Sequence, residues 1–321
     1  MVKLKGLTHM NFKIKSSFKK LIFLILLLIL SATLLFSLEI SLKGGIDNTY
    51  MKPKSVEPVI DDGLAETFDI PLSLLILANV KISGKFGNKF NFFAEYDMDQ
   101  VRVHTLSGGL GYALGHFDIG LGFFLDAPLL RLDALDPGLS GSIGMHWTKA
   151  FFFKATAGSS LDMLELLKGS SNRFFILGEI GFWIPHIYTV FRYYREDYQE
   201  MLDDKIEIAQ LRSIYSMRTE FFSKNVPFRV AVMASYRALN RSITAGNNGS
   251  QKEDPKLGMF IFGLGLTFEL SKYLSFGFDA ELNVNFDNLD FGNFDFKDPN
   301  GFLSRYRVFG GFTFSYPERD Y

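Results

Sequence analysis

The chain has 321 residues, a formal net charge of -1 and no cysteine. A near-neutral charge without a basic face gives no reason to expect nucleic acid as a partner, and the lack of cysteine excludes disulfides, thiolate metal sites and a lipid-modified cysteine. The 35 phenylalanines and 29 glycines indicate long apolar surfaces that alternate with small residues.

The N-terminal segment resembles an export signal. Lysines between Lys3 and Lys20 precede the apolar run from Leu21 to Phe36, and Ser37 is a small residue where cleavage would fall. Met10 would serve as a start as well as Met1, and an uncleaved anchor is the alternative. We expect a cleaved signal peptide over 1–37, one domain over 38–316 and a short C-terminal tail over 317–321.

From Leu38 onward, about fourteen segments alternate large apolar residues with small or polar ones. A period of two predicts β-strands with one apolar and one wet face. The predicted strands are 38–46, 71–85, 89–98, 101–114, 117–126, 139–148, 151–160, 174–184, 186–196, 211–222, 228–239, 260–270, 274–286 and 303–316. The pattern allows twelve to sixteen.

The clearest pair of runs lies between Lys256 and Phe286. Every even position from Phe260 to Leu270 is large and apolar, and the alternation resumes at Leu274 after a short polar link, which predicts a hairpin. Each run exceeds the usual strand of about 5–6 residues and matches the roughly 9–11 residues needed to cross a bilayer at a tilt. We therefore expect a membrane hairpin.

The connections alternate in length along the chain. Tight turns follow the even-numbered predicted strands, whereas the odd-numbered ones are mostly followed by long polar segments, as in a meander with short turns at one rim and long loops at the other. The loops 239–256 and 288–301 are candidate gates. The predicted fold is therefore an all-β, transmembrane, antiparallel up-and-down β-barrel of about fourteen strands.

The apolar face is expected to contact lipid. Side chains alone fill only a barrel of about eight strands, so a wider one has a polar interior, and Arg or Lys on the lipid face costs roughly 2–4 kcal/mol at mid-bilayer. Aromatic residues fall near both expected interfaces, for example Trp147 at the short-turn rim and Tyr236 toward the long-loop rim. A large secreted soluble β-protein is the alternative.

The C-terminal stretch from Gly311 to Tyr316 is similar to the signal that outer-membrane barrels present to the barrel assembly machinery, although the chain continues beyond it and Phe309 stands where that signal is usually polar. The chain thus resembles bacterial outer-membrane β-barrel proteins of the porin-like kind. The resemblance implies the bacterial outer membrane as location, with its lipid and the assembly machinery as partners. Monomeric porins and long-chain fatty-acid channels share the strand count, and the oligomeric state stays open.

Charged residues on the polar face are the candidate pore lining: Arg212, Arg218, Arg229, Arg237, Arg305, Arg307, Glu95, Asp97, Asp279 and Glu281. Basic residues gather on the tenth, eleventh and fourteenth predicted strands and acidic ones on the third, fifth and thirteenth. Opposed charged walls would set a transverse field that biases which solutes pass. The alternative is that Asp279 and Glu281 pair with Arg305 and Arg307 on the neighbouring strand to hold the wall together.

Catalytic and metal sites find no support in the sequence. The five histidines are scattered, and His146 approaches Glu179 only if the sixth and eighth predicted strands bring them together. Carboxylates in the long loops, such as Asp203 and Asp204, are expected to be solvated rather than bound to a cation. We expect no enzyme activity, no cofactor and no metal.

The leading hypothesis is a channel for passive diffusion of small polar or charged solutes. Five inward aromatic residues keep two alternatives open: Phe93, Phe124, Phe152, Phe175 and Trp183. Their burial in one cluster would favour a closed structural or adhesive barrel. A continuous inward path of aromatics would favour uptake of hydrophobic solutes.

Overall fold

The computed structural model describes residues 37–47, 75–87, 89–98, 104–127, 135–147, 150–162, 171–203, 206–223, 225–245, 250–253, 257–284 and 306–316. The expected signal peptide, the expected tail and the candidate gate 288–301 lie outside these residues. No helix in the described part of the chain is long and apolar enough to span a membrane.

The described residues contain fifteen strands, joined in places by described turns. They are β1 (Ser37–Asp47), β2 (Leu75–Phe86), β3 (Phe90–Met98), β4 (His104–Leu114), β5 (Phe117–Ala127), β6 (Asp136–Trp147), β7 (Phe151–Ser160), β8 (Ser171–Ile184), β9 (Ile187–Asp203), β10 (Ile206–Phe221), β11 (Phe228–Ala245), β12 (Ser250–Glu253), β13 (Leu257–Glu269), β14 (Leu274–Val284) and β15 (Tyr306–Tyr316).

The strands close into a ring. Each pairs antiparallel with its neighbour in the chain, and β15 pairs with β1 from Leu38 opposite Tyr316 to Asp47 opposite Arg307. The short strand β12 pairs with the far end of β11, while β11 pairs directly with β13 along the rest of its length. The predicted antiparallel barrel of about fourteen strands is confirmed, with β12 as an addition outside the ring.

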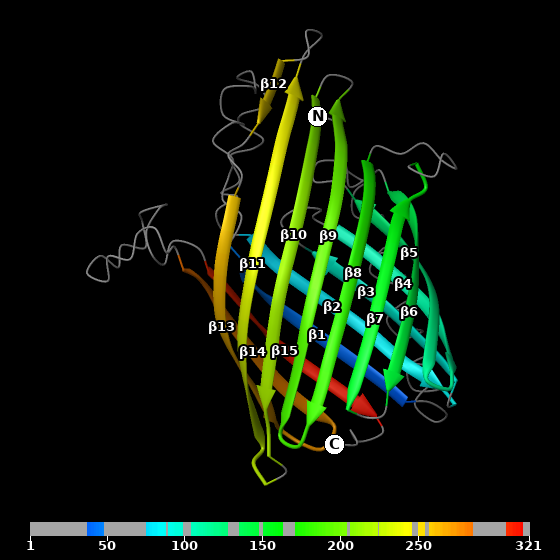
Figure 1. The fold of residues 1–321 in the computed structure, drawn as a ribbon, viewed down its shortest axis with the longest axis vertical. Coiled ribbons are helices and arrows are strands. Elements are labelled where there is room, and N and C mark those ends of the chain that lie inside the picture. Colours follow the sequence, from blue (N-terminus) through cyan, green and yellow to red (C-terminus); the bar gives the residue numbers. More distant parts are fainter. Residues whose placement is uncertain are drawn as a thin grey trace, which may run out of the picture.

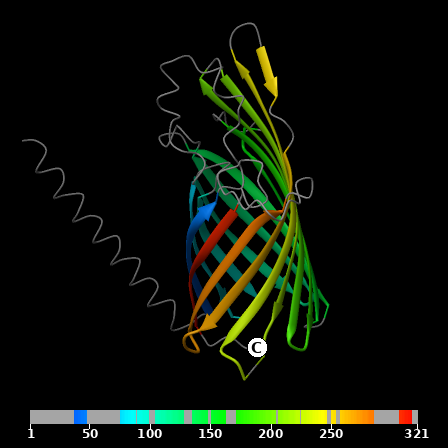
Figure 2. The ribbon, with the colours of Figure 1, turned by 90° about the vertical axis from the view of Figure 1, so that its left-hand side faces the viewer.

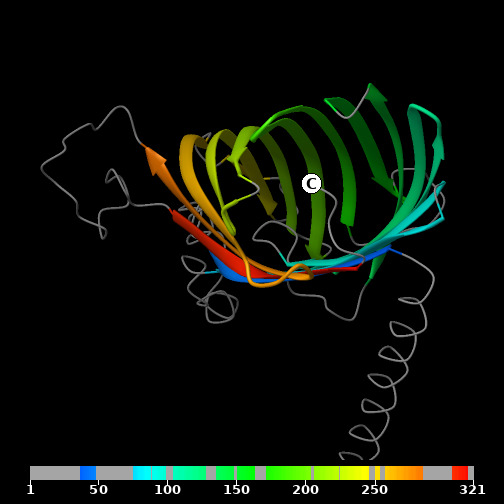
Figure 3. The same cartoon turned by 90° about the horizontal axis from the view of Figure 1, so that it is seen from below.

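The ring is flattened and one of its walls is taller. Seen from below, β8 to β11 arch across one side while β1, β2 and β15 lie along the other (Figure 3). Strands β9 to β11 run almost upright, whereas β1 to β3 and β15 are strongly tilted behind them (Figure 1). In the side view the wall that contains β9 to β11 rises well above the opposite wall (Figure 2).

In the tall wall, the strands extend beyond their predicted limits. We expected strands to end at Glu196 and to start again at Leu211, but β9 continues to Asp203 and β10 begins at Ile206. Within the candidate gate 239–256, the described residues 239–245 and 250–253 form strands instead of a loop, because β11 extends to Ala245 and β12 pairs back onto it. In these extensions both faces carry polar residues, so the alternation that marks a lipid-facing strand is missing.

The outer face of the ring is apolar and exposed. Leu121 is 78% exposed, Leu110 67% and Leu264 62%, and large apolar residues at alternate positions are exposed on most ring strands. Side chains exposed in this number form a far larger patch than a water-soluble surface carries. The expected orientation, with the apolar face toward lipid, is therefore confirmed, and the polar face lines the inside.

Candidate functional site

The inner face of the wall from β10 to β1 carries a ladder of ion pairs. Arg218 on β10 donates from Nε to Glu220 Oε1 at 2.7 Å and from Nη1 to Asp279 Oδ1 at 3.0 Å. Asp279 lies on β14, so the Arg218 and Asp279 side chains together span the two intervening strands β11 and β13. The side chains of this pair must therefore lie along the wall.

Small residues under the ladder make this possible. A methyl group on Gly265 would lie 3.1 Å from both Arg218 Nη2 and the Ala231 side chain, and it would overlap the Asp279 carboxylate. A methyl group on Gly263 would lie 2.9 Å from Glu281 Cγ. Ala231, Gly263 and Gly265 thus form a low floor on which charged side chains lie flat.

Glu281 is the centre of a second set of charges. It accepts a hydrogen bond from Arg237 Nη2 on β11, and its Oε1 lies 3.9 Å from Arg307 Nη1 on β15. Arg307 Nε also lies 3.9 Å from Asp47 on β1. Nearby, Arg229 binds Glu269 at 2.8 Å. Asp47, Arg307, Glu281 and Arg237 thus alternate in charge across the four strands β1, β15, β14 and β11.

The predicted charges lie side by side, not on opposed walls. Glu281 stands opposite Arg307 in the β14–β15 register, which agrees with the neighbour-pairing alternative, whereas Asp279 stands opposite Phe309 and is bound by Arg218. Arg305 lies outside the described residues. A transverse field from a basic wall facing an acidic one does not arise from this group, because Asp279 and Glu281 on β14 are paired with arginines of β10, β11 and β15 on the same wall.

Of the acidic residues expected on the third strand, Glu95 has its own partners on β2. Its Oε2 is 3.5 Å from Lys81 Nζ, and its Oε1 accepts from Asn79 Nδ2 at 2.7 Å. The same amide also donates to Asp97 at 3.1 Å. These contacts form a second polar patch on the wall that includes β2 and β3.

A third cluster, on β4, β5, β8, β9 and β10, is buried. Arg173 donates from Nε to Glu196 at 2.8 Å and from Nη1 to Asp126 at 3.2 Å, and Arg212 donates to the second oxygen of Glu196 at 2.7 Å. Thr105 donates to Asp126 at 2.6 Å. Glu196 is fully buried and Arg212 is 6% exposed. Arg212, predicted to line the pore, thus belongs to a buried charge cluster.

Sequence reasoning missed the centre of this cluster. Arg173 stands just before the predicted strand 174–184, and Glu196 is the last residue of the predicted strand 186–196. The Arg173 guanidinium also stacks on the rings of Phe124 and Phe175, 4.8 and 4.6 Å from their centroids. In the sequence, the signal for this cluster is a charged residue, Arg173, beside an inward-facing phenylalanine, Phe175.

The inward aromatic residues lie against the wall over glycines. A methyl group on Gly109 would lie 2.6 Å from the Phe93 ring, and one on Gly158 would overlap the Phe175 ring. Phe124 and Phe152 cover Gly138 and Gly181 in the same way. Each ring occupies the space that a neighbouring side chain leaves free.

These aromatics form two separate sets of contacts instead of one. Near the short turns, the Trp183 ring lies 5.0 Å from Tyr188 and 5.1 Å from Phe222. Higher on the wall, Phe175 lies 5.8 Å from Phe124 and 6.3 Å from Tyr194. The first set contains exposed and half-buried side chains, whereas the second covers the buried charge cluster.

His146 does not meet Glu179. Its Nε2 lies 2.5 Å from Asp118 on the neighbouring strand β5, while Glu179 accepts from Arg192 at 2.6 Å. Among the described residues, no group of three or more histidines and carboxylates could hold a metal ion.

No family model matches the chain, and no curated protein does. Among solved structures, the chain is similar to a bacterial polysaccharide outer membrane secretin, with 8% identity, a TM-score of 0.41, and coverage of 88% of this chain and 98% of the other. It is also similar to OmpT of Vibrio cholerae, with 8% identity, a TM-score of 0.42, and 88% and 97% coverage. An outer membrane channel from Pseudomonas putida F1 shows 7% identity, a TM-score of 0.43, and 88% and 94% coverage.

The chain's own features establish its class. It is a closed, even-numbered antiparallel ring with an apolar exterior and a polar, charged interior. Closed barrels and helices are the only folds that satisfy every backbone hydrogen bond inside a bilayer, and single-chain barrels of this design are those of bacterial outer membranes. The chain is an outer-membrane β-barrel protein.

Proposed function

We propose that the barrel is an outer-membrane channel for passive diffusion of small polar or charged solutes. The observation that carries the proposal is the flat ion-pair ladder over the floor of Ala231, Gly263 and Gly265. Long charged side chains that cross from β10 to β14 along the wall leave the barrel axis free and still present charge to a solute. Five of the predicted residues line the channel in this proposal through the ladder: Arg218, Arg237, Arg307, Asp279 and Glu281.

Arg229, Glu95 and Asp97 line the channel in the same proposal, outside the ladder. Arg229 is held by Glu269, and Glu95 and Asp97 by Asn79. Because most of these charges have a partner of opposite sign, the lining is close to neutral, and we expect weak ion selectivity. Selectivity then depends on which partner is more exposed to the solute.

A closed structural barrel is the second candidate, favoured by one observation. Tyr198 and Glu196 are 0% exposed although both lie on the inner face of the tall wall, and Leu239, Met259 and Ile261 are also buried there. Inner-face side chains that water does not reach indicate that the interior is filled at this level. Uptake of hydrophobic solutes has less support, because the inward aromatics form two sets of contacts.

Conductance of the refolded mature chain in a planar bilayer tests the proposal, with potassium and chloride selectivity compared. We expect stable steps of fixed size, and a shift of selectivity when Arg218 or Arg229 is replaced by glutamine. A barrel that is shown to be folded and inserted but stays silent would overturn the channel and favour the closed barrel.

A further inference from the structure

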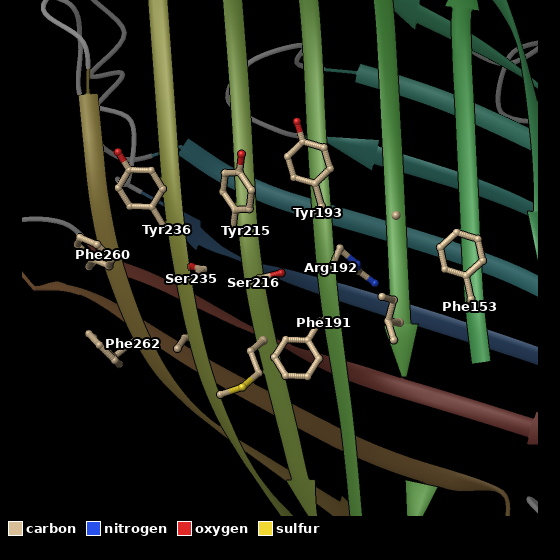
Figure 4. Close-up of a pocket in the computed structure, with 14 residues that line it drawn as sticks. Phe153, Phe191, Arg192, Tyr193, Tyr215, Ser216, Ser235, Tyr236, Phe260 and Phe262 are labelled. Carbon is tan, nitrogen blue, oxygen red and sulfur yellow. The ribbon is translucent and has the colours of Figure 1, made fainter. Parts of the chain in front are cut away.

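A hollow of about 610 Å³ lies on the lipid-facing side of the tall wall, over β7 to β11 and β13. Aromatic side chains rim it, among them Phe153, Phe191 and Phe262 (Figure 4). Two small outward residues make the depression: a methyl group on Gly178 would find no atom within 4 Å, and Ala234 stands between larger neighbours.

A row of aromatic residues forms the upper edge of the groove. Tyr193, Tyr215, Tyr236 and Phe260 stand opposite one another on four neighbouring strands. Successive ring centroids are 4.9, 6.4 and 5.0 Å apart. Figure 4 shows the three tyrosine hydroxyls pointing the same way, away from Phe191 and Phe262. Tyrosines placed in this way mark the boundary between acyl chains and headgroups.

The spacing along the strands agrees with this boundary. From Tyr215 to the end of β10 at Phe221 the strand runs about 20 Å, and from Tyr236 back to Phe228 on β11 about 26 Å, at about 3.3 Å per residue. The apolar band of such barrels is roughly 25 Å tall. The tyrosine row is therefore the outer edge of the band, and the groove lies just inside it.

The next pair of outward-facing residues beyond the tyrosine row, Arg195 on β9 and Ser213 on β10, includes a cation. Arg195 follows Tyr193 by two residues on the same face of β9, stands opposite Ser213 on β10 and is exposed. A guanidinium about 7 Å beyond the tyrosine row is at the level of lipid phosphates, to which arginine binds well. Asp197, two residues further, limits the anion site on the outer side because its carboxylate repels a phosphate.

We propose that this groove binds a phosphate-bearing lipid of the outer leaflet, with one acyl chain in the hollow beside Gly178 and Ala234 and the phosphate at Arg195. The continuity of the groove with the lipid-facing belt favours lipid over a second copy of the chain, and the cation above it selects an anionic headgroup. The proposal depends on membrane insertion alone, so it holds whether or not the barrel conducts.

The test uses two glycines on the lipid-facing surface. Gly178→Leu fills the hollow, while Gly141→Leu adds the same side chain at an outward position of β6 outside the groove, where the nearest atom to a new Cβ is 3.9 Å away. Arg195→Gln removes the cation and leaves the groove. Each refolded full-length barrel is first shown to migrate as a folded, heat-modifiable band.

Retained lipid is then counted by native mass spectrometry after mixing with phosphatidylglycerol or with diacylglycerol of the same chains. We expect the native barrel and Gly141→Leu to retain phosphatidylglycerol about tenfold better than diacylglycerol, since one charge-assisted contact contributes about that factor. Arg195→Gln should lose the preference, and Gly178→Leu should retain neither lipid.

Equal retention of lipid by Gly178→Leu and Gly141→Leu would show that the groove does not hold the acyl chain and would overturn the proposal. A preference for phosphatidylglycerol that survives in Arg195→Gln would overturn the phosphate assignment. A native dimer that disappears in Gly178→Leu would show that the occupant is a second copy of the chain and would also overturn the proposal.

Discussion

Replacing Glu281 by glutamine tests whether the ion pairs of this residue stabilise the fold. The substitution keeps the shape of the side chain and removes the charge that Arg237 and Arg307 share. The Glu281 side chain is 14% exposed and that of Arg237 is 8% exposed. Breaking a buried ion pair costs about 3–5 kcal/mol, and because this pair faces the interior of a barrel we expect the lower end, about 3 kcal/mol.

Glu179 provides a matched control on the same inner face. Its side chain is also 14% exposed, but its partner Arg192 is 54% exposed. A guanidinium that water already solvates loses little when its carboxylate is neutralised, so Glu179→Gln should cost about 0–1 kcal/mol. The two variants change the same chemical group at the same exposure and differ in the burial of the partner.

Urea unfolding of the refolded barrel in lipid vesicles measures both free energies of unfolding. The same proteins in a planar bilayer should show a shift toward chloride for Glu281→Gln, by about threefold if a removed charge acts on an ion about 6 Å away through water. Equal destabilisation by the two substitutions would refute the reasoning, and so would a shift toward potassium.

Three further outcomes are expected. Gly265→Ala should cost about 1–3 kcal/mol through overpacking and should lower the single-channel conductance by lifting the pair above it, whereas Gly277→Ala, whose nearest atom is 3.6 Å away, should do neither. Arg173→Met should lower the free energy of unfolding by about 3–5 kcal/mol, read from urea midpoints, because two buried carboxylates lose their shared cation. Deleting residues 246–253 should leave a folded, heat-modifiable band on gels, since β12 pairs outside the ring.

The barrel could be predicted from the sequence because the bilayer imposes a period of two on the strands inside it. The predicted strand 151–160 has the same limits as β7, and those over 117–126 and 274–286 differ from β5 and β14 by one and two residues. Above the tyrosine row this constraint ends. There the outward positions of β9 are Arg195, Asp197 and Gln199, which look like a loop in the sequence although the backbone continues as a strand.

The pairings on the inner wall could not be predicted for a different reason. Register relates only residues on adjacent strands, whereas the Arg218 side chain passes over two strands to reach Asp279, 61 residues later in the sequence. Such a reach depends on Gly265 and Ala231 being small, and a pair of small residues between two charges is not distinctive in a chain rich in glycine. The sequence therefore identified Arg218 and Asp279 as inward-facing charges, but not as partners.

The flattened ring and the flat ladder would together let a barrel with so many inward charges and phenylalanines keep a lumen, as the proposed channel requires. In a round barrel, long side chains from all strands would converge toward the axis; here arginines lie across neighbouring strands, and rings such as Phe93 and Phe175 lie over glycines of the next strand. Bulk is thereby moved from the axis to the wall. At these inner positions glycine leaves room for the side chains of neighbouring strands that lie over it. Replacing any of these glycines by a larger residue should therefore narrow the lumen, even when the new side chain never touches a solute.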